Sequence, residues 1–514
     1  MASEWDDIAG FGAYGVQSDM LPFRRDKASL DVGENCRPQG GNIAGAGSYG
    51  ITVSLPAQMN TIFYGRDAIG FGNTVASRHI VACGGSAIWR WDGTDFLNIS
   101  NGVPSDGVDQ NGSRWTGGWM QEGFVLSNKV AVRTWRPLID SGSNPMVWDG
   151  GPEGNGDTWE SLGNKAYVMR AGGPSGEYCF AGDIYETAED RQFPSRIRWS
   201  HPVASGNVPE DWVVRDTNLA GYVDIDDTPG GVREMVPLRD YMVIYKRDSI
   251  WISDYIGPPQ VFRFRCVARH HGVMTTDTVV EHNGLHYCHG PDDIFTFDGS
   301  NVKSILWGKV KQQYLSEVDE LRSRSAFTVL DAVREEVLFF YVKTGTGATW
   351  PNRVLVLDLN TKSFWFRDYK TDISHAISTP VVGSLTSRQG FHAVDFNNTR
   401  IIDLEYGTTQ NGTNVLSQIA RYGLYSGPGH ESVQVDTSSL GLSGQQGTFR
   451  LGGQIAPDAP VTWRNAVSMD PVTDYRTDVR HNDQIISYEL TINAPTDWKL
   501  SHISLLVQRA GNRG

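Results

Sequence analysis

The sequence is poor in cysteine and has no long apolar run. Five cysteines occur, an odd number, and none forms a CxxC pair: Cys36, Cys83, Cys179, Cys266 and Cys288. This pattern argues against a disulfide framework and against a zinc ribbon. The longest run of aliphatic and aromatic residues, 337–342, is too short to span a bilayer. We therefore expect reduced, buried thiols and no membrane insertion.

Basic residues are also in deficit. The chain has 45 Lys and Arg against 59 Asp and Glu, which gives a net charge of −14. A protein that grips nucleic acid or an anionic membrane needs a basic face, so the composition disfavours both classes, although DNA can pass an acidic wall without binding. The opening MASEWDDIAGFG is acidic where a secretory signal carries positive charge, and no apolar stretch follows it. We expect synthesis in the cytoplasm.

The common motifs of catalysis and cofactor binding are missing. The sequence contains no GxxxxGK[ST] loop, no GxSxG elbow, no HExxH helix and no GxGxxG between a strand and a helix. His282, His286, Cys288 and His289 could be metal ligands. On a strand, however, His286 and Cys288 share one face while His289 lies on the other, so no closed ligand set forms. We predict no catalytic, cofactor or metal site.

Acidic and aromatic clusters leave a carbohydrate-active or carbohydrate-binding propeller open as an alternative. The carboxylates in 186–190 and 224–227 could serve a glycosidase, which needs only two at a suitable distance, but charges beside turns are usually solvated. Sialidase-type Asp boxes have the form SxDxGxTW, whereas the Asp and Gly of 91–94 are adjacent. Trp89 and Trp91 share one side of their strand and could stack on a sugar. Packing between blades uses the same residue types, and the pattern favours it.

Glycine, tryptophan and short apolar runs are abundant. Between about residues 51 and 407, apolar runs alternate with corners of Asp, Gly, Asn, Ser or Lys, as in successive β-hairpins. The corner residues that we single out favour tight turns: Asp92, Gly93, Asp298, Gly299, Asn360 and Asn397. The corners are often about 40 to 60 residues apart, close to the length of a four-stranded propeller blade. This spacing predicts an irregular β-propeller-like array of about six to eight blades.

The flanking segments differ from this array. Residues 1–50 are Gly-rich and weakly periodic, which predicts an extended arm that a neighbouring subunit must order and whose deletion leaves a folded propeller. Apolar residues at helical spacing predict one inserted helix over 308–327. After residue 408 polar stretches give way to strand-like runs, which predicts a small C-terminal β-sandwich over 408–514. The expected fold class is all-β.

Three parts of the chain resemble the tail nozzle proteins of short-tailed phages, the podoviruses. Residues 15–50 have a Gly-hydrophobic-x-x-Asp start, a Leu-Pro, an Asn-x-Arg and Gly-rich turns, as in that family. Segments within 194–299 follow in the family's order, and 498–514 is similar to its closing strand and Gly-Arg tail. The central family-like motif contains five residues that we single out: Pro194, Arg196, Arg198, Trp199 and Trp212.

The resemblance implies a structural virion protein of the tail, made in the cytoplasm of a bacterial host. It implies a homohexameric ring at the distal end of the tail tube, below an adaptor ring, with fibres or spikes and tip proteins docked on it. Viral double-stranded DNA would pass through the ring's channel without specific binding, because an acidic wall repels phosphates. The alternatives are the carbohydrate-active or carbohydrate-binding propeller and a host-surface binding module without catalysis.

Overall fold

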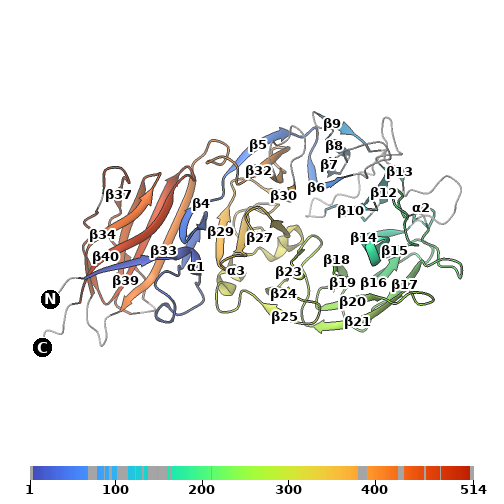
Figure 1. Ribbon diagram of the computed structural model, residues 1–514, viewed down its shortest axis with the longest axis horizontal. Coiled ribbons are helices and arrows are strands. Elements are labelled where there is room, and N and C mark those ends of the chain that lie inside the picture. The colour runs from blue at the N-terminus through green and yellow to red at the C-terminus, as the bar shows by residue number, and fades with distance from the viewer. Residues whose placement is uncertain are drawn as a thin grey trace.

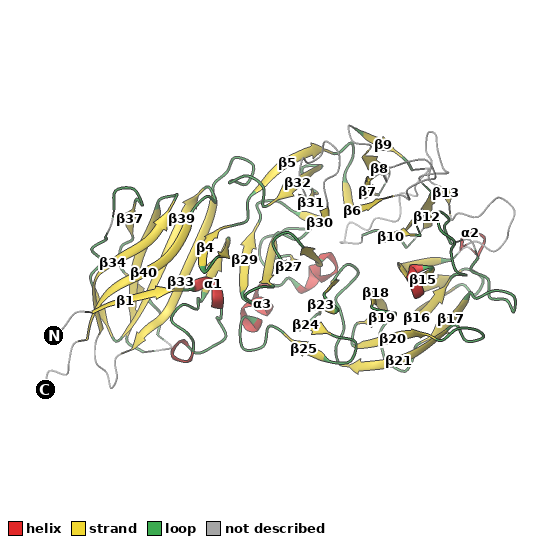
Figure 2. Cartoon of the chain, in the orientation of Figure 1, coloured by secondary structure: helices red, strands yellow, loops and turns green. Residues whose placement is uncertain are grey.

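The computed structural model describes residues 4–66, 78–85, 87–91, 95–100, 114–121, 123–129, 132–136, 147–148, 159–162, 164–209, 211–379, 390–426, 433–456, 459–474 and 476–509. Strands dominate, and the helices are short (Figure 2). The strands form a ring of small sheets and, beside it, a stack of longer strands (Figure 1). No helix of the described residues is long and apolar enough to cross a membrane.

The ring is a β-propeller with seven four-stranded blades among the described residues. Blade 1 consists of β6 (Met59–Arg66), β7 (Arg78–Gly84), β8 (Ile88–Trp91) and β9 (Phe96–Asn98). Blade 2 consists of β10 (Thr116–Met120), β11 (Gly123–Ser127), β12 (Val132–Trp135) and β13 (Val147–Trp148). Blade 3 consists of β14 (Lys165–Gly172), β15 (Tyr178–Glu186), β16 (Arg191–Trp199) and β17 (Gly221–Asp224). Blade 4 consists of β18 (Val232–Leu238), β19 (Tyr241–Lys246), β20 (Ser249–Tyr255) and β21 (Phe262–Arg269). Blade 5 consists of β22 (Val279–His282), β23 (Leu285–His289), β24 (Ile294–Phe297) and β25 (Val302–Ser304). Blade 6 consists of β26 (Phe327–Asp331), β27 (Glu336–Tyr341), β28 (Arg353–Asp358) and β29 (Phe364–Asp368). Blade 7 consists of β30 (Ile373–Thr379), β31 (Gly390–Asp395), β32 (Arg400–Leu404) and β5 (Tyr49–Ser54).

The innermost strands close the ring. They contact one another in the cycle β6, β10, β14, β18, β22, β26, β30 and back to β6. Each blade packs between two neighbours, so its strands bury both faces and need not alternate apolar with polar residues. In blade 6, β27 (EVLFFY) and β28 (RVLVLD) are buried along their whole length. The all-β propeller expected from the hairpin spacing is confirmed, and its seven blades fall within the predicted range.

Blade 7 combines strands from the two ends of the propeller segment. Strand β5 pairs antiparallel with β32, with Tyr49 opposite Leu404 and Val53 opposite Ile401. The chain therefore closes the ring by hydrogen bonds between a strand that precedes blade 1 and three strands that follow blade 6. The propeller accordingly begins at Tyr49 and ends at Leu404.

The second body is a stack of two sheets formed by both chain ends. One sheet contains β1 (Glu4–Ala9), β3 (Cys36–Gln39), β4 (Asn42–Gly45), β34 (Val433–Ser443), β38 (His481–Asp483) and β40 (Lys499–Arg509). The other contains β2 (Val32–Glu34), β33 (Val415–Ser426), β35 (Gly447–Gln454), β36 (Thr462–Trp463), β37 (Val467–Met469) and β39 (Ile485–Ala494). The C-terminal strands thus form a β-sandwich together with strands from the first 50 residues.

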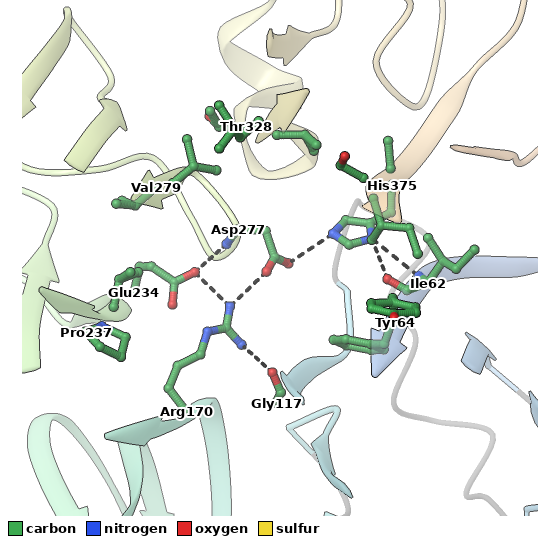
Figure 3. Close-up of a pocket in the computed structure, with 18 of the residues that line it drawn as sticks. Ile62, Tyr64, Gly117, Arg170, Glu234, Pro237, Asp277, Val279, Thr328 and His375 are labelled. Carbon is green, nitrogen blue, oxygen red and sulfur yellow. Dashed lines mark hydrogen bonds and ion pairs between the residues drawn. The ribbon is translucent and has the colours of Figure 1, made fainter. Parts of the chain in front are cut away.

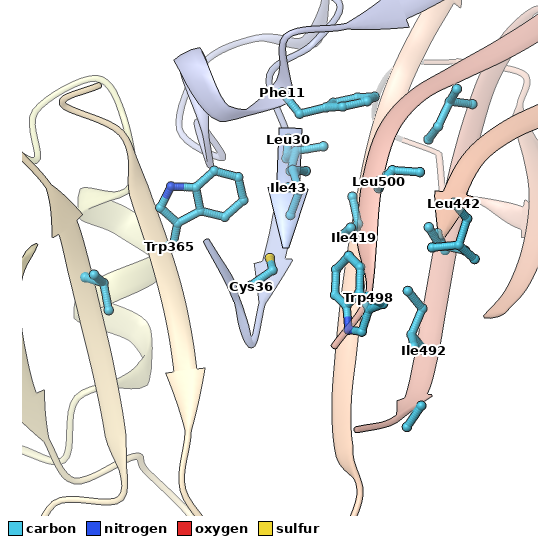
Figure 4. Packing of buried hydrophobic residues seen from close by; sticks show 14 of the residues in the cluster. Phe11, Leu30, Cys36, Ile43, Trp365, Ile419, Leu442, Ile492, Trp498 and Leu500 are labelled. Atoms are coloured by element: carbon cyan, nitrogen blue, oxygen red, sulfur yellow. The ribbon is translucent and has the colours of Figure 1, made fainter. Parts of the chain in front are cut away.

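The prediction that residues 1–50 need a neighbouring subunit for order is wrong. Strand β1 pairs along β40 of the same chain, and β3 and β4 continue that sheet. Apolar side chains of this segment enter the core between propeller and sandwich, where Phe11, Leu30, Cys36 and Ile43 are fully buried (Figure 4). The segment is sparse in apolar residues, but the sheet edges of its own chain satisfy its backbone hydrogen bonds.

Strand β2 joins the two bodies. It lies between β29 of blade 6 and β33 of the sandwich, with Glu34 aligned parallel to Phe366 and antiparallel to Gln418. One ten-stranded sheet therefore runs from the propeller into the sandwich. Trp365 of β29 and Trp498, which directly precedes β40 of the other sheet, belong to the same hydrophobic core (Figure 4).

The predicted helix over 308–327 is shorter than expected. The segment forms α3 (Lys311–Glu317) and the 3-10 turn η4 (Glu320–Ser325), and Phe327 already begins β26. The break comes at Val318, which is extended and bridges Lys343, while the Asp319 carboxylate accepts a hydrogen bond from Leu321 N. The other short helical elements among the described residues are α1 (Phe11–Tyr14), η1 (Pro22–Arg24), α2 (Trp159–Leu162) and η3 (Pro174–Gly176).

The predicted Asp-Gly corner between β24 and β25 is a tight turn. Asp298 Oδ1 accepts hydrogen bonds from the backbone N–H groups two and three residues further on, at 2.8 and 2.7 Å. Gly299 has φ +97°, a left-handed conformation that favours glycine. The other predicted Asp-Gly corner, Asp92 and Gly93, lies outside the described residues.

The two predicted Asn corners also lie in turns. Asn360 stands between β28 and β29, and Asn397 between β31 and β32. The left-handed residues of these turns are Lys362 at φ 57° and Thr399 at φ 51°. Asparagine therefore marks the turns correctly but does not occupy the strained position.

Candidate functional site

The propeller axis contains a cavity of about 620 Å³ to which all seven blades contribute (Figure 3). Its walls come from the innermost strands, because each blade begins at the axis. Apolar side chains such as Ile62, Val279 and Ile377 form most of the lining. This volume is within the range of small-molecule pockets.

A charged network lies on one side of the cavity (Figure 3). Arg170 Nη2 of β14 is 2.9 Å from Glu234 Oε2 of β18 and 2.8 Å from Asp277 Oδ1. Glu234 also accepts hydrogen bonds from the backbone N–H groups of Met235 and Asp277. Asp277 has φ 61°, so its backbone is held in a left-handed turn just before β22. The network ties blades 3, 4 and 5 together at the axis.

One guanidinium serves two carboxylates. Burial lowers the pKa of Arg170, but Glu234 and Asp277 outweigh burial and raise it, so the guanidinium stays charged. Burial and the Asp277 charge raise the pKa of Glu234, and Arg170 only partly opposes them. The three side chains therefore carry one net negative charge when both carboxylates are ionised.

His375 of β30 completes the network from blade 7. Its Nε2 is 4.0 Å from Asp277 Oδ2, and its Nδ1 is 3.0 Å from Ile62 O and 3.3 Å from Ile62 N of blade 1. Burial lowers the pKa of His375 to about 4, so the ring is neutral near pH 7. Among the described residues its ring nitrogens face the Asp277 carboxylate and the Ile62 backbone. We call Arg170, Glu234, Asp277 and His375 the axial clasp, because their hydrogen bonds and ion pairs join neighbouring blades.

Arg114 is a second buried clasp near the axis. Its Nε donates to Ser374 O at 2.7 Å and its Nη1 to Ala326 O at 3.0 Å. The guanidinium also lies over the rings of Phe327 and Trp350, with its carbon 4.8 and 5.5 Å from the centroids. Burial lowers the pKa of Arg114 to about 10, although Asp277 opposes this effect. Arg114 links the start of blade 2 to blades 6 and 7.

The family-like motif lies on blade 3, away from the cavity lining. Arg196 binds Asp224 through two hydrogen bonds, Nε to Oδ1 at 2.7 Å and Nη2 to Oδ2 at 2.8 Å. Its guanidinium carbon lies 3.7 Å from the ring centroid of Phe193 and 4.6 Å from that of Tyr222. Pro194 stands in the irregular stretch of β16 where the pairing with β15 shifts.

The other motif residues are structural as well. Arg198 Nη1 is 2.8 Å from Glu186 Oε1, and its Nε donates to Trp212 O. Trp199 Nε1 donates to Leu219 O at 2.9 Å. Trp212 packs edge-on against a second buried tryptophan, Trp159. The motif thus brings Glu186, Glu189 and Asp224 together around Arg196 and Arg198, where they form ion pairs.

Of the histidine and cysteine residues of 282–289, His286 and Cys288 share the Tyr245 hydroxyl, whereas His282 and His289 have other partners. His286 shares a hydrogen bond with Tyr245 OH at 2.7 Å, and His289 Nε2 lies 2.5 Å from Tyr314 OH. Burial lowers the pKa of His286 to about 4 and that of His289 to about 3. Within the described parts of the chain, no group of three or more possible metal ligands occurs.

The remaining candidates are core residues. Trp91 is buried against Phe96, with ring centroids 5.0 Å apart, and Trp89 packs on the same cluster between blades 1 and 7. Four of the five cysteines are buried, and Cys266 is half-buried. These positions fit packing rather than a sugar platform.

Sequence reasoning missed the axial residues. The available signal was a charge inside a mainly apolar strand, such as Arg170 in KAYVMRAG and Glu234 in VREMVPL. Buried charges are rare unless paired, so such positions mark partners, but only the ring topology shows which partners meet.

Comparisons with known proteins yield structural likeness alone. No family model matches the chain, and no curated protein matches it by sequence. Among solved structures, BBS1N in complex with ARL6DN is 9% identical with a TM-score of 0.39, covering 71% of this chain and 98% of that one. The AfRom2 CNH domain is 10% identical with a TM-score of 0.38, covering 70% and 99%. Hsv2 of Kluyvelomyces marxianus is 10% identical with a TM-score of 0.29, covering 59% and 70%. At these scores the likenesses carry no argument about function.

Proposed function

We propose that the chain is a structural subunit of a short phage tail that assembles into the distal nozzle ring around the DNA ejection channel. The observation that carries the proposal is the interlock of the N-terminal segment, blade 6 and the sandwich in one ten-stranded sheet. Residues 15–50, which resemble the nozzle family, lie within this interlock. A subunit braced in this way suits a wall that withstands the passage of DNA.

In this proposal the DNA channel lies between subunits. The axial cavity of the propeller, at about 620 Å³, matches a small-molecule pocket in size, and the Arg170 network closes part of it. It is therefore no conduit for a duplex. A ring of subunits with net charge −14 each would present an acidic wall, along which phosphates slide without binding.

The proposed neighbours are a second copy on each side, an adaptor ring above, and fibres, spikes or tip proteins on the outside. Large apolar side chains stay exposed on both bodies, among them Trp307 on the propeller and Val472 on the sandwich.

Electron microscopy of the purified chain and of virions labelled with an antibody against it tests the proposal. We expect rings with an axial hole, and label at the distal end of the tail. Monomers that cleave a host polysaccharide would favour the carbohydrate-active alternative.

A further inference from the structure

Trp307 is the most exposed large aromatic side chain of the described residues. It stands between β25 and α3 and is 78% exposed, whereas its neighbours Leu306 and Val310 are fully buried. The buried residues anchor the turn on blades 5 and 6. The indole is thus presented on a fixed support rather than on a loose loop. A large aromatic ring held in water in this way offers apolar surface that a partner can bury.

Lys303, Lys309 and Lys311 lie within four residues of Trp307 along the chain, and Lys311 contacts the indole. Lys311 Nζ lies 5.8 Å from the ring centroid of Trp307 and 3.3 Å from Asp293 Oδ2. Lys309 Nζ donates to the backbone oxygen of Lys362 at 2.9 Å. Within the described part of the chain no carboxylate pairs with Lys303, Lys309 or Lys362. We call Trp307, Lys303, Lys309, Lys311 and Lys362 the Lys-Trp knob.

The sandwich carries a hollow of matching character. Its volume is about 330 Å³, and it lies between β34, β40 and the loop after β37. Its apolar lining includes Leu440, Leu442, Met469 and Val472. Val472 stands at the rim and is 89% exposed. The hollow is wide enough for one large side chain, and Ser439, Thr473, Asp474 and His502 add polar groups to its apolar lining.

Two aspartates border the hollow and hold its loop in shape. Asp470 Oδ1 accepts a hydrogen bond from Val472 N at 2.9 Å, and Asp470 N donates to Asp474 Oδ2 at 2.8 Å. The acidic loop is thus formed in advance and needs no ordering when it binds. The knob is basic and apolar, and the hollow is acidic and apolar.

We propose that the Lys-Trp knob of one subunit inserts into the sandwich hollow of a second copy of this chain. The inference rests on the proposed ring and names the contact that builds it. Knob and hollow lie on different bodies, beside α3 and beside β34 and β37 (Figure 1), so the contact is head-to-tail. Head-to-tail contacts close into rings when the rotation permits. The indole supplies a buried anchor, and the lysine and aspartate rims set orientation and salt dependence.

Complementary variants of the full chain test this contact by mass photometry and sedimentation velocity. Trp307→Ala removes the knob, and Val472→Arg blocks the hollow. Each variant alone should associate at least about 30-fold more weakly than wild type, because truncating an interface anchor costs that much. A one-to-one mixture should form dimers and nothing larger, since each mixed pair has only one complete contact.

Controls separate this inference from the ring itself. Val333→Ser removes a matched exposed apolar side chain from the turn after β26 and should assemble as wild type does. Unchanged thermal melting of the two test variants shows that they fold. Wild-type rings together with undiminished assembly of Trp307→Ala or Val472→Arg would overturn the contact and leave the ring standing. A wild-type chain that stays monomeric at micromolar concentration and is absent from virion rings would overturn both.

Discussion

The backbone N–H of Gly47 donates hydrogen bonds to both carboxylate oxygens of Glu405, at 3.0 and 3.1 Å. Gly47 precedes the strand that closes blade 7, and Glu405 follows the last strand of the propeller. Glu405 Oε1 also lies 3.3 Å from Arg367 Nη1 of blade 6, and Arg37 of β3 binds Oε2. One buried carboxylate therefore fastens the ring closure, blade 6 and the sandwich.

Glu405→Gln should destabilise the protein and reduce its acid sensitivity. Burial alone would raise the pKa of Glu405, but Arg367, Arg37 and Arg334 outweigh it and lower the pKa from 4.5 to about 2. The folded pKa is the lower one, so this contribution is present above about pH 4.5 and is lost as the pH falls toward 2. At about 1.4 kcal/mol per tenfold change in proton affinity, the contribution of Glu405 to the free energy of unfolding is about 3 kcal/mol at pH 7.

Urea unfolding at several pH values between 2 and 7 checks this prediction. The variant should lose about 3 kcal/mol at pH 7 and show a flatter pH dependence below pH 4.5. Parallel curves for wild type and variant would show that Glu405 does not carry this linkage.

His375→Gln should make the protein less sensitive to mild acid. Burial lowers the pKa of His375 from 6.5 to about 4, so the folded state resists protonation. Stability is then full above about pH 6.5 and falls as the pH drops from 6.5 through 4. Denaturant titrations at pH 7, 5.5 and 4.5 should give a smaller loss in the variant than in wild type. The exposed His270→Gln is the matched control and should follow wild type; an equal response of both variants would contradict the prediction.

Arg170→Met should unfold the propeller more easily. The change leaves Glu234 and Asp277 buried without their cation, which costs about 3–5 kcal/mol for a buried pair. Arg263→Met is the control, because its partner Asp254 is shared with Arg265 and its side chain is 65% exposed. That surface change should cost about 0–1 kcal/mol. Urea unfolding at pH 7 compares them, and equal losses would argue against the axial clasp.

Deleting residues 1–54 should abolish the cooperative melting of the whole chain. The deletion removes β5 from blade 7 and β1 to β4 from the sandwich, so both bodies lose strands. This reverses the expectation from sequence that a truncated propeller stays folded. Calorimetry of the truncation, with a deletion of residues 1–9 that removes only the edge strand β1 as control, checks the prediction. A melt like that of the full chain would contradict it.

Local signals in the sequence suffice for the hairpins. The Asp298–Gly299 turn follows from an Asp-Gly pair between two apolar runs, and the buried strands of blade 6 follow from runs such as EVLFFY. Long-range pairing is different. That β5 completes blade 7, and that β2 enters the sheet between β29 and β33, depends on partners hundreds of residues away. No local pattern in a Gly-rich segment encodes such a choice.

The axial clasp and the early end of α3 show the same difference between local sequence signals and long-range contacts. Arg170, Glu234 and Asp277 meet because three blades point their first strands at one axis, and their spacing along the chain carries no trace of this. The spacing of Val310 and Tyr314 does predict a helix that packs on the blades. It does not predict its early end, where Val318 pairs with Lys343 instead of continuing the helix.

Cryo-electron microscopy of the purified full chain and of labelled virions tests the central claim most directly. The account predicts a closed head-to-tail ring with an axial hole between subunits, each propeller keeping its own axial cavity closed to DNA, at the distal end of the tail. A monomer or an open filament in both samples, or a ring whose lumen is lined by basic residues, would contradict it.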